Sequence, residues 1–167
     1  LIAEHGVAAV TPRAVCERAG LARSSFYDYF PSKDDLLAAI AIQAFEEWAA
    51  ELDAVIAAAP PGRARLHAYV EATIRMAADG KHDLATELQQ AELSPKSLDA
   101  VMEMHDTLIA PLQHVLLDLG LPEDRALLTL VRGVISAGMQ LVAHGATVDD
   151  TIGSVTALLD RGANPPE

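Results

Sequence analysis

The sequence predicts an all-α protein, and three observations carry that prediction. Hydrophobic residues make up 51% of the 167 residues, while aromatic residues make up only 4%. Strand-forming residues are scarce, and apolar residues recur at spacings of three and four, the period of an α-helix. The length suits one or two small domains with a real core. We therefore expect an N-terminal helix-turn-helix followed by a helical bundle.

The first six residues, ending at Gly6, have the pattern of the last turns of a helix. A helix of this kind should begin before Leu1. We therefore expect a truncated first helix, with residues missing upstream.

Residues 11–30, TPRAVCERAGLARSSFYDYF, have the pattern of a helix, a tight turn and a second helix. Thr11 suits an N-cap, and the proline after it suits the first helical position. Gly20 can adopt the left-handed conformation that ends a helix. A second helix is predicted from about 22 to 29, where Pro31 stops it. Such a helix-turn-helix can place its second helix in the major groove of DNA.

A long amphipathic helix follows the motif. Ser32 is its expected N-cap, and the break Pro60-Pro61-Gly62 ends it. We expect this helix to link an N-terminal domain that holds the helix-turn-helix, residues 1–46, to a second helical domain, residues 47–167. Helices are predicted in the second domain over about 63–78, 82–91 and 94–119, with a kink at Pro111 in the last of these.

The next predicted helix, from 122 to about 144, has one narrow polar stripe made by Thr129, Arg132, Ser136 and Gln140. The rest of its circumference is apolar, so it should be buried on more than one side. A second copy of the chain is the simplest partner for the outer side. A final helix over about 148–161 completes the bundle. The predicted dimer interface is Leu127, Val131, Val134, Ile135, Gly138, Met139, Ile152, Val155 and Leu159.

Charge is distributed unevenly along the chain. The net charge is −12, but residues 1–36 hold four basic and five acidic side chains and so contribute only −1. The remaining residues therefore contribute −11. We favour the interpretation that this acidity keeps the protein soluble; the alternative is that it limits non-specific DNA binding.

The single cysteine, Cys16, rules out a disulfide within the chain and is typical of a reducing cytoplasm. We expect it to be a small core residue rather than a redox sensor. No signal peptide is recognisable, and the apolar run 126–143 is interrupted by Arg132, which argues against a membrane span. The expected location is the cytoplasm.

The first 37 residues resemble the TetR family of bacterial transcriptional regulators. The resemblance rests on Val10-Thr11, Ala19-Gly20-Leu21 and above all the run FYDYFPSKDDLL. It implies a homodimer that binds double-stranded operator DNA as a repressor and releases it when a small-molecule effector fills a pocket in the helical domain. The rest of the chain resembles the family only in architecture.

The resemblance also implies roles for individual residues. Thr11 would contact a phosphate, and Arg13 a phosphate or a base edge. Arg23 is the best candidate for guanine O6 and N7, because its fork geometry fits both acceptors. The remaining DNA-binding positions are Ser24 and Ser25 beside it, Tyr27 and Tyr29 at phosphates or thymine methyl groups, and Lys33 at a phosphate.

Two residues depart from the family pattern. Ala22 stands where the family usually has a capping Ser or Thr, so this cap must come from elsewhere. Asp28 lies on a helix that should face phosphates. We favour its pointing to solvent; the alternative is that it accepts from a cytosine or pairs with an Arg.

The second domain shows no motif for catalysis, for a cofactor or for a metal. Its histidines lack ligand spacing, and no phosphate loop or nucleophile motif occurs. The candidate pocket residues are Trp48, Tyr69, Met76, Gln89, Met102, His105 and Gln113. The hypothesis is a ligand-responsive repressor rather than an enzyme. The alternative is a dimeric helical ligand-binding or interaction protein whose DNA binding is weak or lost.

Overall fold

A computed structural model describes residues 1–80, 94, 95, 97, 99 and 110–162. Every regular element within these residues is helical, which confirms the all-α prediction. The chain divides into two compact units. The described residues of the first unit are 1–46 with 94, 95, 97 and 99, and those of the second are 47–80 and 110–162.

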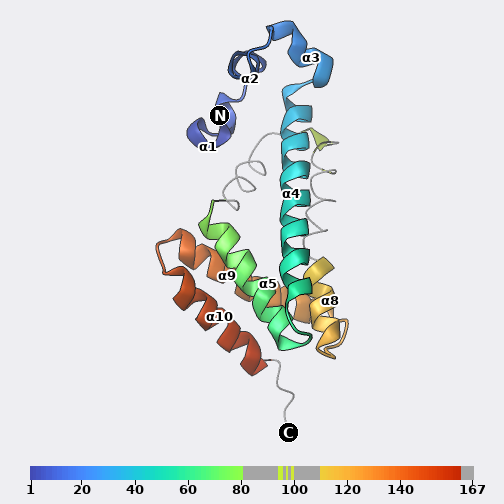
Figure 1. The fold of residues 1–167 in the computed structure, drawn as a ribbon, viewed down its shortest axis with the longest axis vertical. Helices are drawn as coiled ribbons and strands as arrows, with labels where there is room; N and C mark the ends of the chain where they lie inside the picture. The colour runs from blue at the N-terminus through green and yellow to red at the C-terminus, as the bar shows by residue number, and fades with distance from the viewer. Residues whose placement is uncertain (81–93, 96, 98, 100–109, 163–167) are drawn as a thin grey trace. The chain divides into compact units, whose positions relative to one another are not determined.

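The first unit begins with a short helix α1 (Ile2–His5), which ends at Gly6 as expected. A 3-10 turn η1 (Val7–Ala9) leads to α2 (Pro12–Ala19). The 3-10 turn η2 (Arg23–Ser25) and α3 (Phe26–Tyr29) follow, and α4 (Lys33–Ala58) starts after them. Figure 1 shows α1, α2 and α3 in blue and α4 in cyan to teal.

The ends of α2 follow the sequence prediction closely. Thr11 is in extended conformation, and its Oγ1 accepts a hydrogen bond from the N–H of Ala14 at 3.2 Å. Gly20 ends the helix in the left-handed conformation, with φ 70° and ψ 26°. Its N–H and that of Leu21 both bond to the Cys16 carbonyl, which satisfies acceptors that the helix end leaves free.

The predicted second helix of the motif forms in two pieces. The 3-10 turn Arg23–Ser25 comes first, and only Phe26–Tyr29 is α-helical. Ala22 lies at the N-cap position and offers no side-chain acceptor, so the first turn tightens through the bond from Ser25 N–H to the Ala22 carbonyl at 2.9 Å.

A small apolar core holds the first unit together. Cys16 is 3% exposed and Phe26 3%, so both are core residues as predicted. The ring of Phe26 lies 5.9 Å from that of Phe30. The other buried members are Val10, Leu36, Leu37, Ala38, Ala41 and Phe45.

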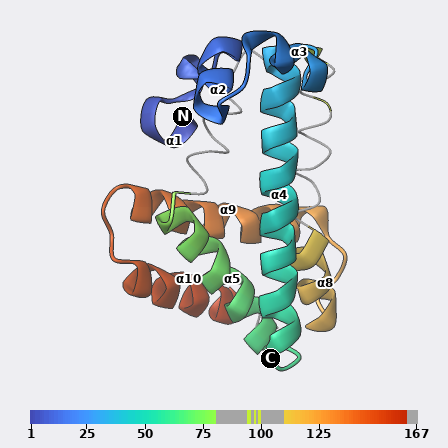
Figure 2. The same cartoon turned by 45° about the horizontal axis from the view of Figure 1, so that its top comes forward.

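The second unit is a bundle. It contains the end of α4, then α5 (Arg63–Ala78), α8 (Ala110–Asp118), α9 (Arg125–Ala143) and α10 (Val148–Gly162). Figure 2 shows α9 and α10 lying alongside each other with α5 crossing both, and all three helices are in mutual contact. The predicted segments 63–78 and 148–161 match α5 and α10. The predicted helix 82–91 and much of 94–119 lie outside the described residues.

The core of the second unit lies where α5, α8, α9 and α10 meet. Val70, Ile74 and Leu112 are completely buried there. Gly138 of α9 is a point of close approach, because a Cβ at this position would lie 2.8 Å from Val155 Cγ2 and 3.3 Å from Ile74 Cδ1. The absence of a side chain at Gly138 therefore lets α9 pack closely on α10 and α5.

The structure corrects part of the predicted dimer interface. Five of its residues are already buried within the single chain: Val131, Ile135, Gly138, Val155 and Leu159. A partner has nothing left to cover there. The other four, Leu127, Val134, Met139 and Ile152, are half-buried and pack against the same core. Periodicity identified the apolar positions but assigned the core side of the helix to the partner.

The circumference of α9 has three sectors. The first sector faces the core. The second sector is polar and contains the exposed residues Thr129, Arg132 and Gln140. The third sector is apolar and also exposed, with Leu130 68% and Leu141 55% exposed. Ala126, Gly133 and Ala137 lie between these leucines and are exposed as well.

By length and composition alone, α9 could cross a membrane; it is the one such helix in the part of the chain that the structure describes. That is weak evidence, because a helix of a soluble bundle meets the same criterion. The core-facing sector of α9 packs against α5 and α10.

Candidate nucleic-acid interface

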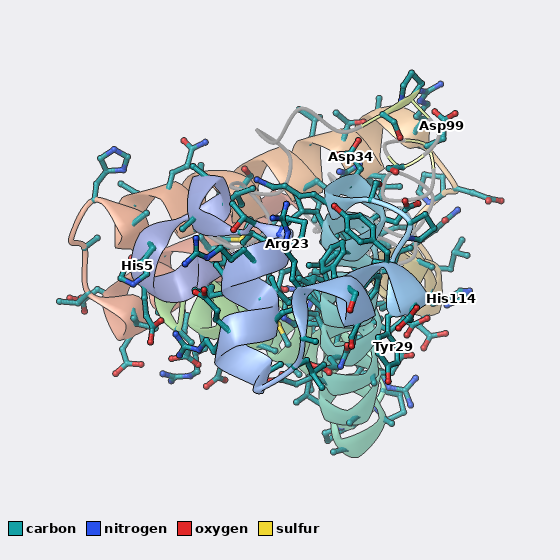
Figure 3. The ribbon with its side chains drawn as sticks, turned by 90° about the horizontal axis from the view of Figure 1, so that it is seen from above. His5, Arg23, Tyr29, Asp34, Asp99 and His114 are labelled. Atoms are coloured by element: carbon teal, nitrogen blue, oxygen red, sulfur yellow. The ribbon has the colours of Figure 1, made fainter. Side chains whose placement is uncertain are left out.

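Apart from Lys33, which begins α4, the residues expected to contact DNA lie on α2, η2 and α3 or next to them. These three elements pack against one another. Tyr27 is 56% exposed and Tyr29 71%, although large aromatic side chains are usually buried. Arg23 and Tyr29 are labelled in Figure 3. Thr11, Arg13 and Ser24 are also exposed, and Ser25 is half-buried.

One of the two tyrosines, Tyr27, contacts the core of the first unit. Phe26 lies edge-on to Tyr27, with ring centroids 5.3 Å apart and planes 79° apart. This contact limits the movement of the exposed ring. Asp28, between the two tyrosines, is exposed, consistent with the interpretation that it points to solvent.

Both arginines of α2 are paired with carboxylates. Arg13 Nε donates to Glu17 Oε1 at 2.7 Å, one helical turn away. Arg18 holds Glu4 of α1 by two hydrogen bonds, of which Nη2 to Oε1 is 3.0 Å. The Arg18 guanidinium lowers the pKa of Glu4 to about 2, mainly through these hydrogen bonds and then through its charge.

Arg23 differs from the other two arginines. Among the described residues, its side chain has no ion-pair partner, and it is exposed. Its backbone is held instead, because its carbonyl accepts the Cys16 thiol at 3.9 Å. The buried cysteine thus joins η2 to α2 through the backbone, and the Arg23 side chain is exposed.

Lys33 is anchored inside the unit. Its Nζ donates to the Val7 carbonyl at 3.1 Å, which joins η1 to the start of α4. The ammonium has three protons, so this bond leaves two for other acceptors.

Two more contacts fix the start of α4. Ser32 Oγ accepts from the N–H of Asp35 at 3.2 Å, which confirms the predicted cap. Asp34 Oδ2 accepts the backbone N–H of Ser94 at 3.0 Å. A segment far along the chain is therefore bound to the helix that follows the motif.

This arrangement can present one unpaired guanidinium, two phenol groups and several hydroxyls to a polyanion. Arginine forks and hydroxyls are common donors to phosphates and base edges. The contacts of Glu17, Glu4 and Asp34 were not predicted from the sequence. The spacing of Arg13 and Glu17 by four residues was a visible signal. The contacts of Glu4 and Asp34 join distant parts of the sequence and had no such signal.

The candidate pocket residues of the second unit do not gather into a described site. Tyr69 and Met76 are buried in the core, and Trp48 packs against it. Burial raises the pKa of the Tyr69 phenol. Gln113 Nε2 donates to Glu123 Oε1 at 3.0 Å. Gln89, Met102 and His105 lie outside the described residues. In the part of the chain that is described, no three His, Cys, Asp or Glu side chains are grouped as metal ligands.

Residues 1–40 match a family profile described as bacterial regulatory proteins, tetR family. This range contains every residue of the candidate interface. No curated protein sequence matches the chain significantly.

The whole chain is similar in fold to several solved structures. The fatty acid degradation regulator FadR of Bacillus halodurans has a TM-score of 0.75 at 19% identity, over 95% of this chain and 88% of that one. FadR of Bacillus subtilis, solved in complex with stearoyl-CoA, has a TM-score of 0.76 at 20% identity, over 95% of this chain and 91% of that one. The regulator PfmR of Thermus thermophilus has a TM-score of 0.67 at 20% identity, over 95% of this chain and 90% of that one. At such identities the likeness establishes the fold.

Proposed function

We propose that the chain is a DNA-binding transcriptional regulator of the TetR family, a repressor that a small-molecule ligand releases from its operator. The match of residues 1–40 to the tetR family profile supports this proposal. One observation carries the DNA-binding part. Exposed Arg23, Tyr27 and Tyr29 stand on two short elements whose backbones are tied to a buried core. Exposed donors on a rigid support suit the reading of a DNA groove.

Binding to DNA tests this proposal directly. A pool of random duplexes is enriched on the purified protein, and the winning sequence is titrated by fluorescence polarisation at several salt concentrations. We expect saturable, salt-sensitive binding to a sequence with two related half-sites, about 34–36 Å apart for successive major grooves. If no sequence is enriched and no duplex binds at low salt, the alternative of an interaction protein without DNA binding replaces the proposal.

Arg23 is the residue proposed to read a base. An Arg23→Ala variant should lose about 1–3 kcal/mol of binding free energy, and its preference for one base should weaken at a single operator position. This is the usual contribution of a bidentate guanine contact. Arg13, Thr11, Ser24, Ser25 and Lys33 are proposed as further contacts. Equal weakening on every sequence would assign Arg23 to a phosphate instead.

Dimerisation is proposed through the exposed apolar sector of α9 together with Leu158 of α10, which is 56% exposed. Large apolar side chains in one sector, with small ones between them, allow close approach of a second copy. Leu130→Glu should give monomers by light scattering, whereas Gln140→Glu on the polar sector should leave the dimer intact. If the Leu130→Glu variant is still a dimer by light scattering, the dimer interface does not include this sector of α9.

The ligand is proposed to act on the second unit and to change the spacing of the two N-terminal units in the dimer. A coupling of about 1–3 kcal/mol corresponds to roughly 5–150-fold weaker operator binding. Stearoyl-CoA, present in the Bacillus subtilis FadR structure, is a first probe. A ligand that binds the protein but leaves operator affinity unchanged would contradict this coupling. We propose no enzymatic activity, and the cytoplasm as the location.

A further inference from the structure

The Arg13–Glu17 pair lies on the outer surface of α2. The side chain of Arg13 is 75% exposed and that of Glu17 62%, and their 2.7 Å contact joins residues one turn apart. Arg13 is also one of the cations proposed to contact DNA, so its carboxylate partner would stand beside any phosphate that approaches it.

A carboxylate in this place changes the ion balance of binding. A free arginine that neutralises a phosphate releases a condensed counterion from the DNA. If Arg13 leaves Glu17 to reach a phosphate, Glu17 becomes an unpaired anion near the DNA and attracts a cation from solution. If Arg13 stays with Glu17, the phosphate keeps its counterion. In both cases the net release of ions from this contact is close to zero.

We propose that Glu17 is a positioning residue that weakens DNA binding by holding Arg13, and so reduces the sequence-independent part of the affinity. This inference rests on the proposed DNA-binding function. Arg18 is paired with Glu4 in a similar way, which leaves Arg23 as the arginine of the motif with no described carboxylate. When carboxylates pair with the arginines that would contact phosphates, the affinity for DNA depends more on the base contacts of Arg23.

The size of the effect follows from counterion release. One additional phosphate contact steepens the plot of log affinity against log salt by about 0.9 for each protomer. Relative to the wild type, Glu17→Gln should therefore gain about 3.5-fold in affinity per protomer when salt is lowered from about 200 to 50 mM. Glutamine keeps the length and the hydrogen-bonding oxygen of the side chain and removes only its charge.

The experiment measures binding to a fluorescein-labelled duplex of mixed sequence, which isolates the phosphate term. The variants are Glu17→Gln, Arg13→Gln, the double variant and Asp53→Asn. Asp53 is an exposed acid on the part of α4 in the second unit, so Asp53→Asn changes the net charge equally without touching α2. Circular dichroism checks that each variant has the helix content of the wild type.

Glu17→Gln should bind more tightly and with a steeper salt slope. The gain should disappear in the Arg13→Gln background, and Asp53→Asn should bind as the wild type does. An unchanged slope in Glu17→Gln, an equal gain without Arg13, or an equal gain in Asp53→Asn would overturn the inference while leaving DNA binding intact. Failure of the wild type and all variants to bind any duplex would instead overturn the proposed function, and the inference with it.

Discussion

Gly138 is a position where the packing of the second unit leaves no room for a side chain, and Gly138→Ala is the perturbation that tests it. The added methyl carbon would lie 2.8 Å from Val155 Cγ2, 3.3 Å from Ile74 Cδ1 and 3.5 Å from Thr151 Cγ2. Carbon atoms prefer separations of about 3.5–4.0 Å, so α9 or its neighbours must move by several tenths of an ångström.

Two opposing effects set the magnitude of the change in unfolding free energy. Overpacking a well-filled core costs about 1–3 kcal/mol. Replacing a glycine inside a helix by alanine gains up to about 1 kcal/mol, because alanine has the higher helix propensity. We expect a net loss of about 0–3 kcal/mol in the free energy of unfolding, because the gain in helix propensity offsets part of the steric cost.

A double-mutant cycle with Val155→Ala separates these effects. Shortening Val155 removes the carbon that lies nearest, so Gly138→Ala in that background should no longer be destabilising. Urea unfolding followed by circular dichroism at one fixed protein concentration gives the four free energies. The explanation by close packing fails if Gly138→Ala has the same effect with and without Val155.

Three further predictions follow from local features. Gly20→Ala should cost about 1–2 kcal/mol in urea unfolding although a Cβ there meets nothing within 4 Å, because its φ of +70° is strained for alanine; an unchanged stability would contradict this. Ile74→Ala, at a completely buried position, should cost about 2–5 kcal/mol by the same method, and a smaller loss would mean that the core collapses onto the cavity. The Glu4 carboxyl should titrate at about pH 2 by NMR and return to its ordinary range near 4.5 in Arg18→Gln. Since its folded pKa is depressed, the stability that this pair contributes is present above pH 4.5 and is lost as pH falls from 4.5 to about 2. Titration near 4.5 in the wild type would show that the pair does not form in solution.

Much of the fold could be predicted because local chemistry determines it. Helix α2 begins after Thr11, whose side chain accepts a hydrogen bond, and ends at Gly20, whose backbone is left-handed. Both signals are visible in the residue type. The α9 N-cap, Asp124, accepts from the N–H of Ala126 at 2.8 Å and lies within the expected start of that helix. The break at Pro60-Pro61-Gly62 likewise separates α4 from α5.

What failed in the prediction depends on three-dimensional packing. Apolar periodicity marked Ile135 and Val155 as buried but could not say whether their own chain or a partner covers them. The 3-10 turn Arg23–Ser25 follows from the lack of a side-chain cap at Ala22, and the sequence predicted a regular helix there instead. The partner of Arg18 lies 14 positions away, and no spacing rule reaches that far.

The hydrogen bond from Ser94 to Asp34 has a consequence for when the contacts of the first unit can form during translation. It joins positions 60 residues apart, so the N-terminal unit gains this contact only after the whole of α5 has left the ribosome. Translation that stops within α5 therefore yields a chain that carries the helix-turn-helix but leaves the start of α4 without this partner. In such a chain the carboxylate of Asp34 would lack the backbone N–H that it accepts in the full chain, so the start of α4 would keep only its local contacts, such as the Ser32 cap.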